Sequence, residues 1–246
     1  MSSATGATER RIVGWQPATV REVIRETPSA TTLILDVPGW RGHRAGQHAD
    51  IRLTAEDGYQ AQRSYSIASA PEDGYAAITV ERLDDGEVSP YLVDDAQVGD
   101  AMEIRGPVGG WFVWETSDGG PLMLVAGGSG VVPLRSILRH RALAGSDAPA
   151  RLLLSARAPE SVIYRDELAG ADTTITYTRS APDGWTGYAR RVDRDMLAAV
   201  GFAPAERPRI YICGPTAFVE GVAADAVALG HHTDRIRTER FGATGG

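Results

Sequence analysis

The sequence predicts two domains of different fold: an antiparallel β-sandwich or β-barrel, followed by an α/β domain built on a parallel sheet. Residues 20–105 show period-two alternation, as in TTLILDV, where Leu33, Leu35 and Val37 alternate with polar or smaller neighbours. Several such segments are separated by turns rich in glycine, proline and aspartate, a pattern typical of antiparallel sheets. After residue 115, short continuous apolar segments alternate with helical ones, which indicates a parallel sheet with crossover helices.

The second half supplies four candidate buried strands and two candidate helices. The strand segments read PLMLVA, RLLLSA, ITYTR and RIYICG, and the helical segments read VPLRSILRHRALAG and TAFVEGVAADAVALG. The pattern changes at TSDGG (116–120), which is typical of a linker. We therefore predict a flexible lead-in at residues 1–11, a barrel domain at 12–116 and an α/β domain at 117–246.

Composition excludes several classes of protein. The 246 residues carry a formal charge of −7 that is spread along the chain, which argues against a nucleic-acid partner. No apolar run is long enough to span a membrane, and no signal-peptide core begins the chain. The single cysteine cannot supply the four thiolates of a typical iron–sulfur cluster, and the five histidines lack metal-site spacing. We expect a cytoplasmic, monomeric protein without a bound metal.

A glycine-rich turn between a buried strand and a helix is the strongest local signal of function. In PLMLVAGGSGVVPLRSIL, Gly128 and Gly130 let the backbone approach a ligand closely, and Pro133 suits the first helical turn. The helix N-terminus then presents free N–H groups to a phosphate. The spacing is G-x-G-x-x-P rather than G-x-G-x-x-G, but the strand before it and the helix after it are the context that such a motif needs. We interpret this turn as a pyrophosphate-binding loop.

Two arginines at the ends of the next strands bear on which dinucleotide binds. An acidic residue at the tip of the second strand selects the ribose of NAD, whereas arginine accommodates the 2′-phosphate of NADP. Here Arg157 follows RLLLSA and Arg179 follows ITYT, with no acid before Glu160. We favour NADPH over NADH on this basis, although an arginine at such a place is more often only a surface charge.

The barrel half holds a possible second phosphate site and a hydroxyl-rich strand. In GEVSPYLVDD, Ser89 is a good helix N-cap, and Gly86 ahead of it leaves room for the backbone. In RSYSIAS, Arg63 can contact a phosphate and Tyr65 can lie flat on an aromatic ring. Along a strand, Arg63 and Tyr65 share one face and Ser66 lies on the other. All three can reach one ligand only if the strand ends or bends near Tyr65, so the stretch taken alone favours a hydroxyl-rich edge strand.

Five short motifs together identify a family. They are Arg63-Ser64-Tyr65-Ser66, Gly86-Glu87-Val88-Ser89, Gly127-Gly128-Ser129-Gly130, Cys213-Gly214-Pro215 and Glu239-Arg240-Phe241-Gly242. In this order and spacing, over nearly the whole chain, the sequence resembles the ferredoxin–NADP reductase superfamily, and within it the stand-alone bacterial reductases. The resemblance implies a flavin-binding β-barrel domain followed by a Rossmann-like NAD(P)-binding α/β domain. Many relatives also carry a [2Fe–2S] domain, for which this sequence has too few cysteines.

The resemblance implies roles for residues of the barrel. Tyr65 is expected to stack on the isoalloxazine, Ser66 to approach flavin N5, and Arg63 and Ser89 to hold flavin phosphate. The expected flavin site also includes Ser64, Val80, Glu81, Gly86 and Val88. FAD is the commoner flavin in the family, and FMN is the alternative because a phosphate grip serves both.

The resemblance also implies roles for residues of the α/β domain. Gly128 and Gly130 are expected to face the pyrophosphate of the nicotinamide cofactor. Cys213, with Gly214 and Pro215 opening the next helix, is expected near the nicotinamide. Glu239 and Phe241 are expected to close the site around the flavin. Ser66, Cys213 and Glu239 are thus the expected catalytic residues.

The expected activity is hydride transfer from NAD(P)H to bound FAD, followed by release of electrons to a separate acceptor. The expected acceptor is a ferredoxin, a flavodoxin, or the oxygenase or metalloenzyme component of a multi-protein system. One alternative is a reductase that uses free flavin as a substrate. An alternative of another class is a redox-sensing or electron-transfer subunit without turnover of its own.

Overall fold

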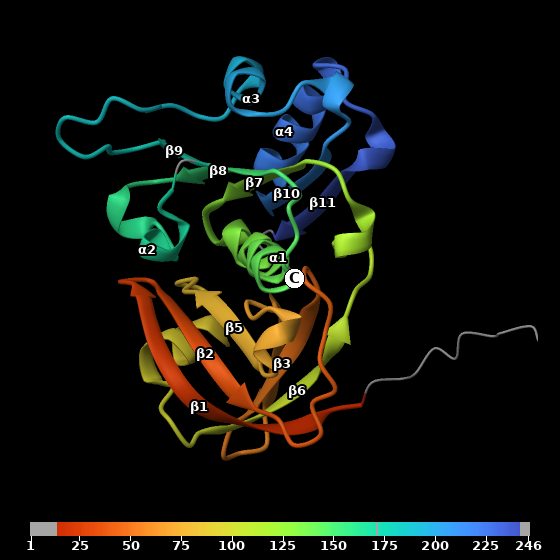
Figure 1. Cartoon of the computed structure of the whole chain (residues 1–246). Helices are drawn as coiled ribbons and strands as arrows, with labels where there is room; N and C mark the ends of the chain where they lie inside the picture. The colour runs from red at the N-terminus through yellow and green to blue at the C-terminus, as the bar shows by residue number, and fades with distance from the viewer. Residues whose placement is uncertain (1–13, 171, 242–246) are drawn as a thin grey trace, which may run out of the picture.

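The computed structural model describes residues 14–170 and 172–241, which fold into two domains (Figure 1). The expected flexible segment at residues 1–11 lies outside the described residues. Figure 1 shows the barrel, coloured red to yellow, below the α/β domain, coloured green to blue, with helix α1 at their junction. Both expected fold types are therefore present, in the expected order.

The first domain is an antiparallel sheet that curls into a barrel. Its strands are β1 (Gln16–Thr27), β2 (Ala30–Asp36), β3 (His48–Thr54), β4 (Gln60–Ser66), β5 (Ala76–Glu81) and β6 (Ala101–Val108), in the order β4-β3-β6-β1-β2-β5. The two edge strands meet where Ile67 bridges Ile78 and the N–H of Ala68 donates to the carbonyl of Ala77 at 2.7 Å. This contact closes the barrel, which answers the choice between sandwich and barrel. Alternating side chains such as Leu33, Leu35 and Ile51 fill its core.

The second domain is a five-stranded parallel sheet covered on both faces. Its strands are β7 (Leu122–Gly127), β8 (Ala150–Ala156), β9 (Thr173–Tyr177), β10 (Arg209–Pro215) and β11 (Ile236–Phe241), in the order β11-β10-β7-β8-β9. The helices are α1 (Val131–Leu143), α2 (Arg165–Leu168), α3 (Arg194–Val200) and α4 (Thr216–Ala228). The four predicted strand segments correspond to β7, β8, β9 and β10. Burial on both faces explains why these strands lack alternation.

Short helices complete the described chain. They are η1 (Pro71–Asp73), the π-helical η2 (Tyr91–Asp95), η3 (Thr116–Asp118), η4 (Gly128–Gly130), η5 (Pro159–Ser161), η6 (Pro204–Glu206) and η7 (Thr233–Arg235). The η3 turn lies in the predicted linker. It connects the buried Trp114 to β7, and Asp118 within it is bound by Arg209 of β10, so the linker is tied to the α/β domain.

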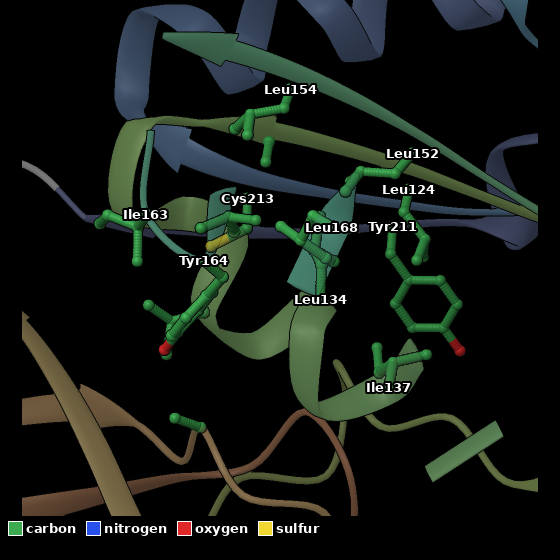
Figure 2. Close-up of a cluster of buried hydrophobic side chains, with 14 of the residues drawn as sticks. Leu124, Leu134, Ile137, Leu152, Leu154, Ile163, Tyr164, Leu168, Tyr211 and Cys213 are labelled. Carbon is green, nitrogen blue, oxygen red and sulfur yellow. The ribbon is translucent and has the colours of Figure 1, made fainter. Parts of the chain in front are cut away.

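One face of the parallel sheet packs on α1, and the cluster there continues toward the barrel. Figure 2 shows Leu134 and Ile137 of α1 with Leu124, Leu152 and Cys213 of the sheet. The same cluster includes Ala30, Ala68 and Ala77 of the barrel. The other face of the sheet packs on α3 and α4 through a second cluster that includes Met196 and Val222. The two domains therefore share apolar core on the α1 side.

Polar contacts also join the domains on the α1 side, which we call the fixed seam. Ser136, fully buried on α1, donates to the carbonyl of Ser69 at 2.7 Å. Arg139 forms an ion pair with Asp73 at 2.6 Å, where only 10% of the Asp73 side chain is exposed. The hydroxyls of Tyr164 and Thr79 are hydrogen-bonded across the same seam. Buried bonds of this kind fix the relative position of the elements that they join.

Candidate functional site

The glycine loop after β7 lies against the tip of β10. Gly128 has a φ of +56°, which favours glycine, and Gly130 is the N-cap residue of α1. A Cβ atom added to Gly130 would lie 2.1 Å from the carbonyl oxygen of Cys213. Only glycine allows this approach, so the predicted loop and the predicted cysteine strand are brought together. In open α/β sheets, ligands bind beyond the carboxyl ends of the strands, where these residues lie.

The tip of β10 differs in detail from the sequence prediction. We expected Gly214 and Pro215 to open the helix, but β10 continues through Pro215, and α4 begins at Thr216. The reason is pairing, because Gly214 and Pro215 still face Arg240 and Phe241 of β11 in parallel register. A Cβ on Gly214 would lie 2.8 Å from the ring of Phe218, so this strand tip also requires a small residue.

Cys213 is a buried, neutral thiol at this edge. Burial raises the pKa of Cys213 well above its usual value, and the nearby charge of Glu239 raises it further. A thiol in that state is a poor nucleophile. Cys213 therefore offers a neutral thiol at the carboxyl end of β10 rather than thiolate chemistry.

Among the carboxyl groups of the described site, Glu239 has the pKa that is shifted most from its ordinary value. It lies on β11 opposite Cys213, and its Oε1 is 3.8 Å from Nδ1 of His48 on barrel strand β3. Its Oε2 is buried without a hydrogen-bond partner. Burial raises the pKa of Glu239 to about 7. A carboxyl group that titrates near neutrality can hold or release a proton under physiological conditions.

The RSYSIAS stretch forms the last part of β4 and the barrel closure. Pairing with β3 is regular from Gln60 to Ser66, so the strand does not break its register at Tyr65. The chain changes its pairing partner one residue after Ser66, where Ile67 no longer pairs with β3 and instead forms a bridge to Ile78 of β5. Tyr65 is partly buried against the barrel core, and burial raises its pKa. Hence Tyr65 is held as a neutral phenol, and Ser66 stands at the end of the strand.

Arg63 and Ser64 lie on opposite faces of β4 and have different partners. Arg63 reaches toward the Gly86–Ser89 stretch, with its Nη2 atom 3.5 Å from Oε2 of Glu87. This places Arg63 beside the second expected phosphate segment. Ser64 instead donates to Asp50 at 2.5 Å, and Asp50 also pairs with Arg105. The structure therefore does not bring the hydroxyl of Ser64 to the Arg63 face.

The expected N-cap role of Ser89 is wrong. A helical turn starts at Ser89 itself and continues into η2, and the carbonyl of Val88 accepts from the N–H of Leu92. The Ser89 hydroxyl instead accepts from the N–H of Leu83 at 3.1 Å, which folds the preceding turn back onto the helix. Gly86 is required there, because its Cβ would lie 2.7 Å from Ser89 Oγ. Val88 is fully buried and belongs to the barrel core.

The end of β5 faces the glycine loop across the junction of the domains. Val80 is fully buried in the barrel core, so its side chain does not line the site. Glu81, the last residue of β5, is half-buried, and its Oε2 lies 3.7 Å from the position of a Cβ on Gly128. A barrel residue and the nucleotide-type loop are therefore direct neighbours.

The remaining expected residues lie at the edges of the parallel sheet. Arg157 and Arg179 are adjacent, because the N–H of Arg179 donates to the carbonyl of Arg157 at 3.0 Å, and both side chains are exposed. Phe241 ends β11 and is 38% exposed. Gly242 of the same motif lies outside the described residues. Two guanidinium groups at neighbouring strand ends can reach one phosphate.

His48 is the site residue that the sequence reasoning missed. It belongs to the predicted strand HADIRLT, and it was grouped with histidines that lack metal-site spacing. Its partner Glu239 is on the last strand of the other domain, so no local pattern connects the two. One signal was available in the sequence. In HADIRLT, Ala49 and Ile51 alternate as buried residues, so His48 must lie on the other face of this strand, away from the barrel core.

Two further searches of the described residues bear on the class of protein. Across 14–170 and 172–241, no three or more histidine, cysteine or acidic side chains are grouped so that they could hold a metal ion. Over the same residues, no helix has both the length and the apolar character needed to span a membrane.

The comparisons with known proteins match both domains. The oxidoreductase FAD-binding domain matches residues 18–113, and the oxidoreductase NAD-binding domain matches residues 124–224. NADH oxidoreductase HCR of Escherichia coli is 30% identical over 225 residues, covering 90% of this chain and 66% of the relative. The glycine betaine monooxygenase reductase subunit of Chromohalobacter salexigens is 32% identical over 235 residues, covering 91% and 63%. The chain thus spans just under two thirds of these relatives.

A solved structure shows the same fold. The flavohem-like FAD/NAD-binding domain of nitric oxide dioxygenase from Vibrio cholerae is 25% identical, with a TM-score of 0.78, and the match covers 92% of this chain and 98% of that one. The fold and the two domain matches define an oxidoreductase with an FAD-binding barrel and an NAD-binding α/β domain. The chain belongs to the ferredoxin–NADP reductase superfamily, which confirms the resemblance of its motifs.

The described residues fit a flavin and a nicotinamide at the junction of the domains. The glycine loop leaves backbone room that a Cβ would fill, and the buried Oε2 of Glu239 lacks a partner that a bound ligand can supply. On the barrel side, the Arg63 guanidinium lies beside the Gly86–Ser89 stretch and is a group that can contact a phosphate.

Proposed function

We propose that this chain is an NAD(P)H-dependent flavoprotein reductase that passes electrons to a separate redox protein. The observation that carries the proposal is the meeting of the two ligand-binding segments, where Glu81 of the barrel lies beside Gly128 of the nucleotide loop. A flavin held by the barrel and a nicotinamide held by the α/β domain would then share one junction. We place the boundary between the domains at residues 116 and 117, between the two family-model matches.

Each group of residues has a separate task in this proposal. Arg63 and the backbone of Gly86–Ser89 hold the flavin phosphates, and the Tyr65 ring packs on the flavin. Gly128 and Gly130 let the N–H groups at the start of α1 face the nicotinamide cofactor's pyrophosphate. Arg157 and Arg179 bind a 2′-phosphate, which favours NADPH.

Three residues surround the reacting end. Ser66, at the end of β4, offers a hydroxyl, and Cys213 offers a neutral thiol that limits the space beside the nicotinamide. Glu239 holds or releases a proton near neutral pH. When bound, FAD would supply the redox chemistry, which is the acceptance of a hydride and the release of single electrons. The protein supplies alignment, exclusion of water and hydrogen bonds.

We propose a ferredoxin, a flavodoxin or an oxygenase component as the acceptor. Relatives named as the reductase subunit of a glycine betaine monooxygenase and as the ferredoxin reductase component of a 3-ketosteroid monooxygenase support this choice. The monomeric state and the cytoplasmic location remain predictions from the sequence.

The decisive experiment is anaerobic titration of the purified protein with NADPH and with NADH, followed by its visible spectrum. We expect a yellow protein that either nucleotide bleaches, with tighter binding of NADPH. A colourless protein that reduces added flavin would instead favour the free-flavin reductase. A yellow protein that neither nucleotide bleaches would contradict turnover and favour the electron-transfer subunit.

Two sets of variants test the proposed phosphate contacts, one for the flavin and one for the nicotinamide cofactor. Arg63→Ala should lower the flavin content of the purified protein, while Arg21→Ala, on the outer part of β1, should not. Replacing both Arg157 and Arg179 by alanine should raise KM for NADPH about tenfold or more and leave KM for NADH nearly unchanged, since each lost charged hydrogen bond contributes on the order of 1.5–3 kcal/mol. An equal effect on both nucleotides would contradict the 2′-phosphate assignment.

A further inference from the structure

The second junction between the domains contains a histidine–carboxyl pair, of which only Glu239 has a task in the proposed function. His48 begins β3 of the barrel, and Glu239 lies in β11 of the α/β domain, with 3.8 Å between Nδ1 and Oε1. The side chains are 30% and 26% exposed, so each is mostly enclosed while one edge reaches solvent. We call this His48–Glu239 junction the open seam.

The position of the His48 ring is set by the barrel. In its sheet, His48 pairs with Ser66 on one side and with Val108 on the other, so its backbone is held by both neighbouring strands. Its ring lies against Gly109, where a Cβ would be 3.2 Å from both Cε1 and Nδ1. Gly109 has a φ of +92°, which favours glycine. The ring therefore packs on bare backbone and directs Nδ1 toward Glu239.

The two oxygens of Glu239 have different surroundings. Oε1 faces His48, whereas Oε2 is buried and has no hydrogen-bond partner. A buried polar atom without a partner is costly, and in native proteins it commonly marks a place where a ligand or a water supplies the missing bond. Glu239 lies opposite Cys213 in the β10–β11 register. Oε2 of Glu239 therefore lies near the carboxyl ends of the parallel strands, where the nucleotide is expected.

The charged and titratable groups around the pair lie on β3, β6, β10 and β11. Asp50 of β3 raises the pKa of His48, but burial of the ring outweighs it and lowers that pKa. Asp50 is itself paired with Arg105 of β6. On β11, Arg237 donates to the carbonyls of Trp111 and Val113, and on β10 the Cys213 thiol is neutral. The pair is thus not tied to a fixed countercharge.

Both members of the pair are disposed toward their neutral forms. Burial lowers the pKa of His48 and raises the pKa of Glu239 to about 7, so burial favours the neutral form of each group. Because Nδ1 and Oε1 are only 3.8 Å apart, a change of charge on one group is felt by the other.

We propose that His48 is a positioning residue for Glu239. The His48 ring orients Oε1 of Glu239 and leaves Oε2 free for the ligand. It also passes a proton between Glu239 and solvent. This inference rests on the proposed function, because the ligand is the flavin–nicotinamide pair. The Nδ1 proton passes to Oε1, and the ring regains a proton from water. The 3.8 Å separation exceeds a hydrogen bond, so transfer requires a closure of about 1 Å or one bridging water.

The first test uses the protein without flavin and needs no turnover. Nuclear magnetic resonance titration of the histidine ring signals gives the pKa of His48, which is assigned by its loss in His48→Phe. In Glu239→Gln, the pKa of His48 should fall by about half a unit or more, because the carboxylate that favours the imidazolium is gone. A smaller change would overturn the coupling. His232→Asn, in an exposed turn, is the control that should leave the titration of His48 unchanged.

The second test compares two replacements of His48 in the flavin-loaded protein. The single-turnover rate of flavin reduction is measured against pH for wild type, His48→Phe and His48→Asn. We expect the apparent pKa of this profile to shift by about half a unit or more in His48→Phe. Asparagine keeps a donor close to the position of Nδ1, so His48→Asn should retain nucleotide KM within about twofold while losing the histidine ionisation. Wild-type profiles in both variants would overturn the proposal.

The two tests separate the inference from the proposed function. If wild-type protein is not reduced by either nucleotide, the proposed function fails, yet the titration without flavin still measures the coupling. If wild type is reduced but His48 is uncoupled from Glu239, the inference alone fails.

Discussion

The two seams between the domains are built in opposite ways. The fixed seam joins α1 to the barrel by shared apolar core, the Ser136–Ser69 hydrogen bond and the Arg139–Asp73 ion pair. At the open seam, His48 and Glu239 approach only to 3.8 Å, and a carboxylate oxygen is left without a partner. The comparison teaches that one seam sets the relative position of the domains, while the other retains unsatisfied groups for a ligand.

Such a division is expected where binding and catalysis share a domain junction. Satisfied buried contacts stabilise one arrangement, and residues poised for a ligand are commonly kept at some cost in stability. Tyr164 shows a similar cost within the fixed seam, because this non-glycine residue adopts a φ of +59° and directs its hydroxyl to Thr79. Three substitutions test the contrast between the seams.

The largest expected effect lies between the two seams, at the glycine loop. Gly130→Ala would place a methyl group 2.1 Å from the Cys213 carbonyl oxygen, so β10 or α1 must shift. We expect the free energy of unfolding to fall by about 3 kcal/mol, as in severe overpacking, with loss of nucleotide binding. Urea unfolding measures the first effect and calorimetric titration the second.

The matched control is Gly221→Ala in α4, where an added Cβ meets nothing within 4 Å. That change should stabilise the protein by about 0.5–1 kcal/mol, because alanine is the better helix former. If Gly130→Ala behaved like this control, the close packing of loop and strand tip would be wrong.

The second effect sharpens the description of the open seam. Glu239 has a folded-state pKa of about 7, raised by burial from its ordinary value of 4.5. The folded protein therefore binds more protons than the unfolded chain between these values, and stability falls as pH rises through this window. Glu239→Gln removes the ionisation, so the variant without flavin should gain up to about 3 kcal/mol at pH 8 and little at pH 4.5.

Chemical unfolding at several pH values measures this difference. His48 works in the opposite direction, because its lowered pKa makes stability rise as pH rises toward 6.5, so it is left unchanged in both proteins. A pH-independent difference between wild type and Glu239→Gln would show that the carboxyl group is not held in the way described.

The smallest of the three effects tests the fixed seam. Arg139→Ala removes the hydrogen bonds from Arg139 to Asp73. Burial alone would raise the pKa of Asp73, but these bonds, together with one from the N–H of Ala70, outweigh burial and lower that pKa. We expect a loss of about 1–2 kcal/mol near neutral pH, because a mostly buried carboxylate loses its charged partner. Thermal unfolding at pH 7 measures it.

Arg240→Ala is the comparison, because Arg240 pairs with Glu220 where both side chains are well exposed. Its loss should change stability by less than about 0.5 kcal/mol. Equal effects of the two arginine substitutions would remove the distinction between a buried, domain-joining ion pair and a surface one.

Much of the fold was predictable because it follows from local pattern. Alternation along Leu33, Leu35 and Val37 identified a barrel strand, and continuous apolar runs identified the buried parallel strands. The glycine loop was also predictable, since strand, glycine spacing and helix occur together in the sequence. Closure of the barrel at Ile67 was not, because it depends on how far two edge strands curl toward each other.

The site was predicted less completely than the fold, for two physical reasons. Ser89 fits the composition of an N-cap, but the N–H of Leu83 competes for its hydroxyl, and a local rule cannot weigh that competition. His48 and Glu239 meet only after both domains have folded and packed, so neither residue carries a sequence signal of the other. Ser64 shows the same limit, because its partner Asp50 is chosen by strand register.

The position of β11 has a consequence for how the protein is made. In the described chain, β11 follows every other strand; it is the edge strand of the parallel sheet, pairs with β10 and carries Glu239. Domains generally fold in order as the chain emerges from the ribosome. The barrel can therefore be complete while Glu239 is still unsynthesised. Because Glu239 lies on β11, the site is complete only once β11 has paired with β10, after the barrel has already been synthesised.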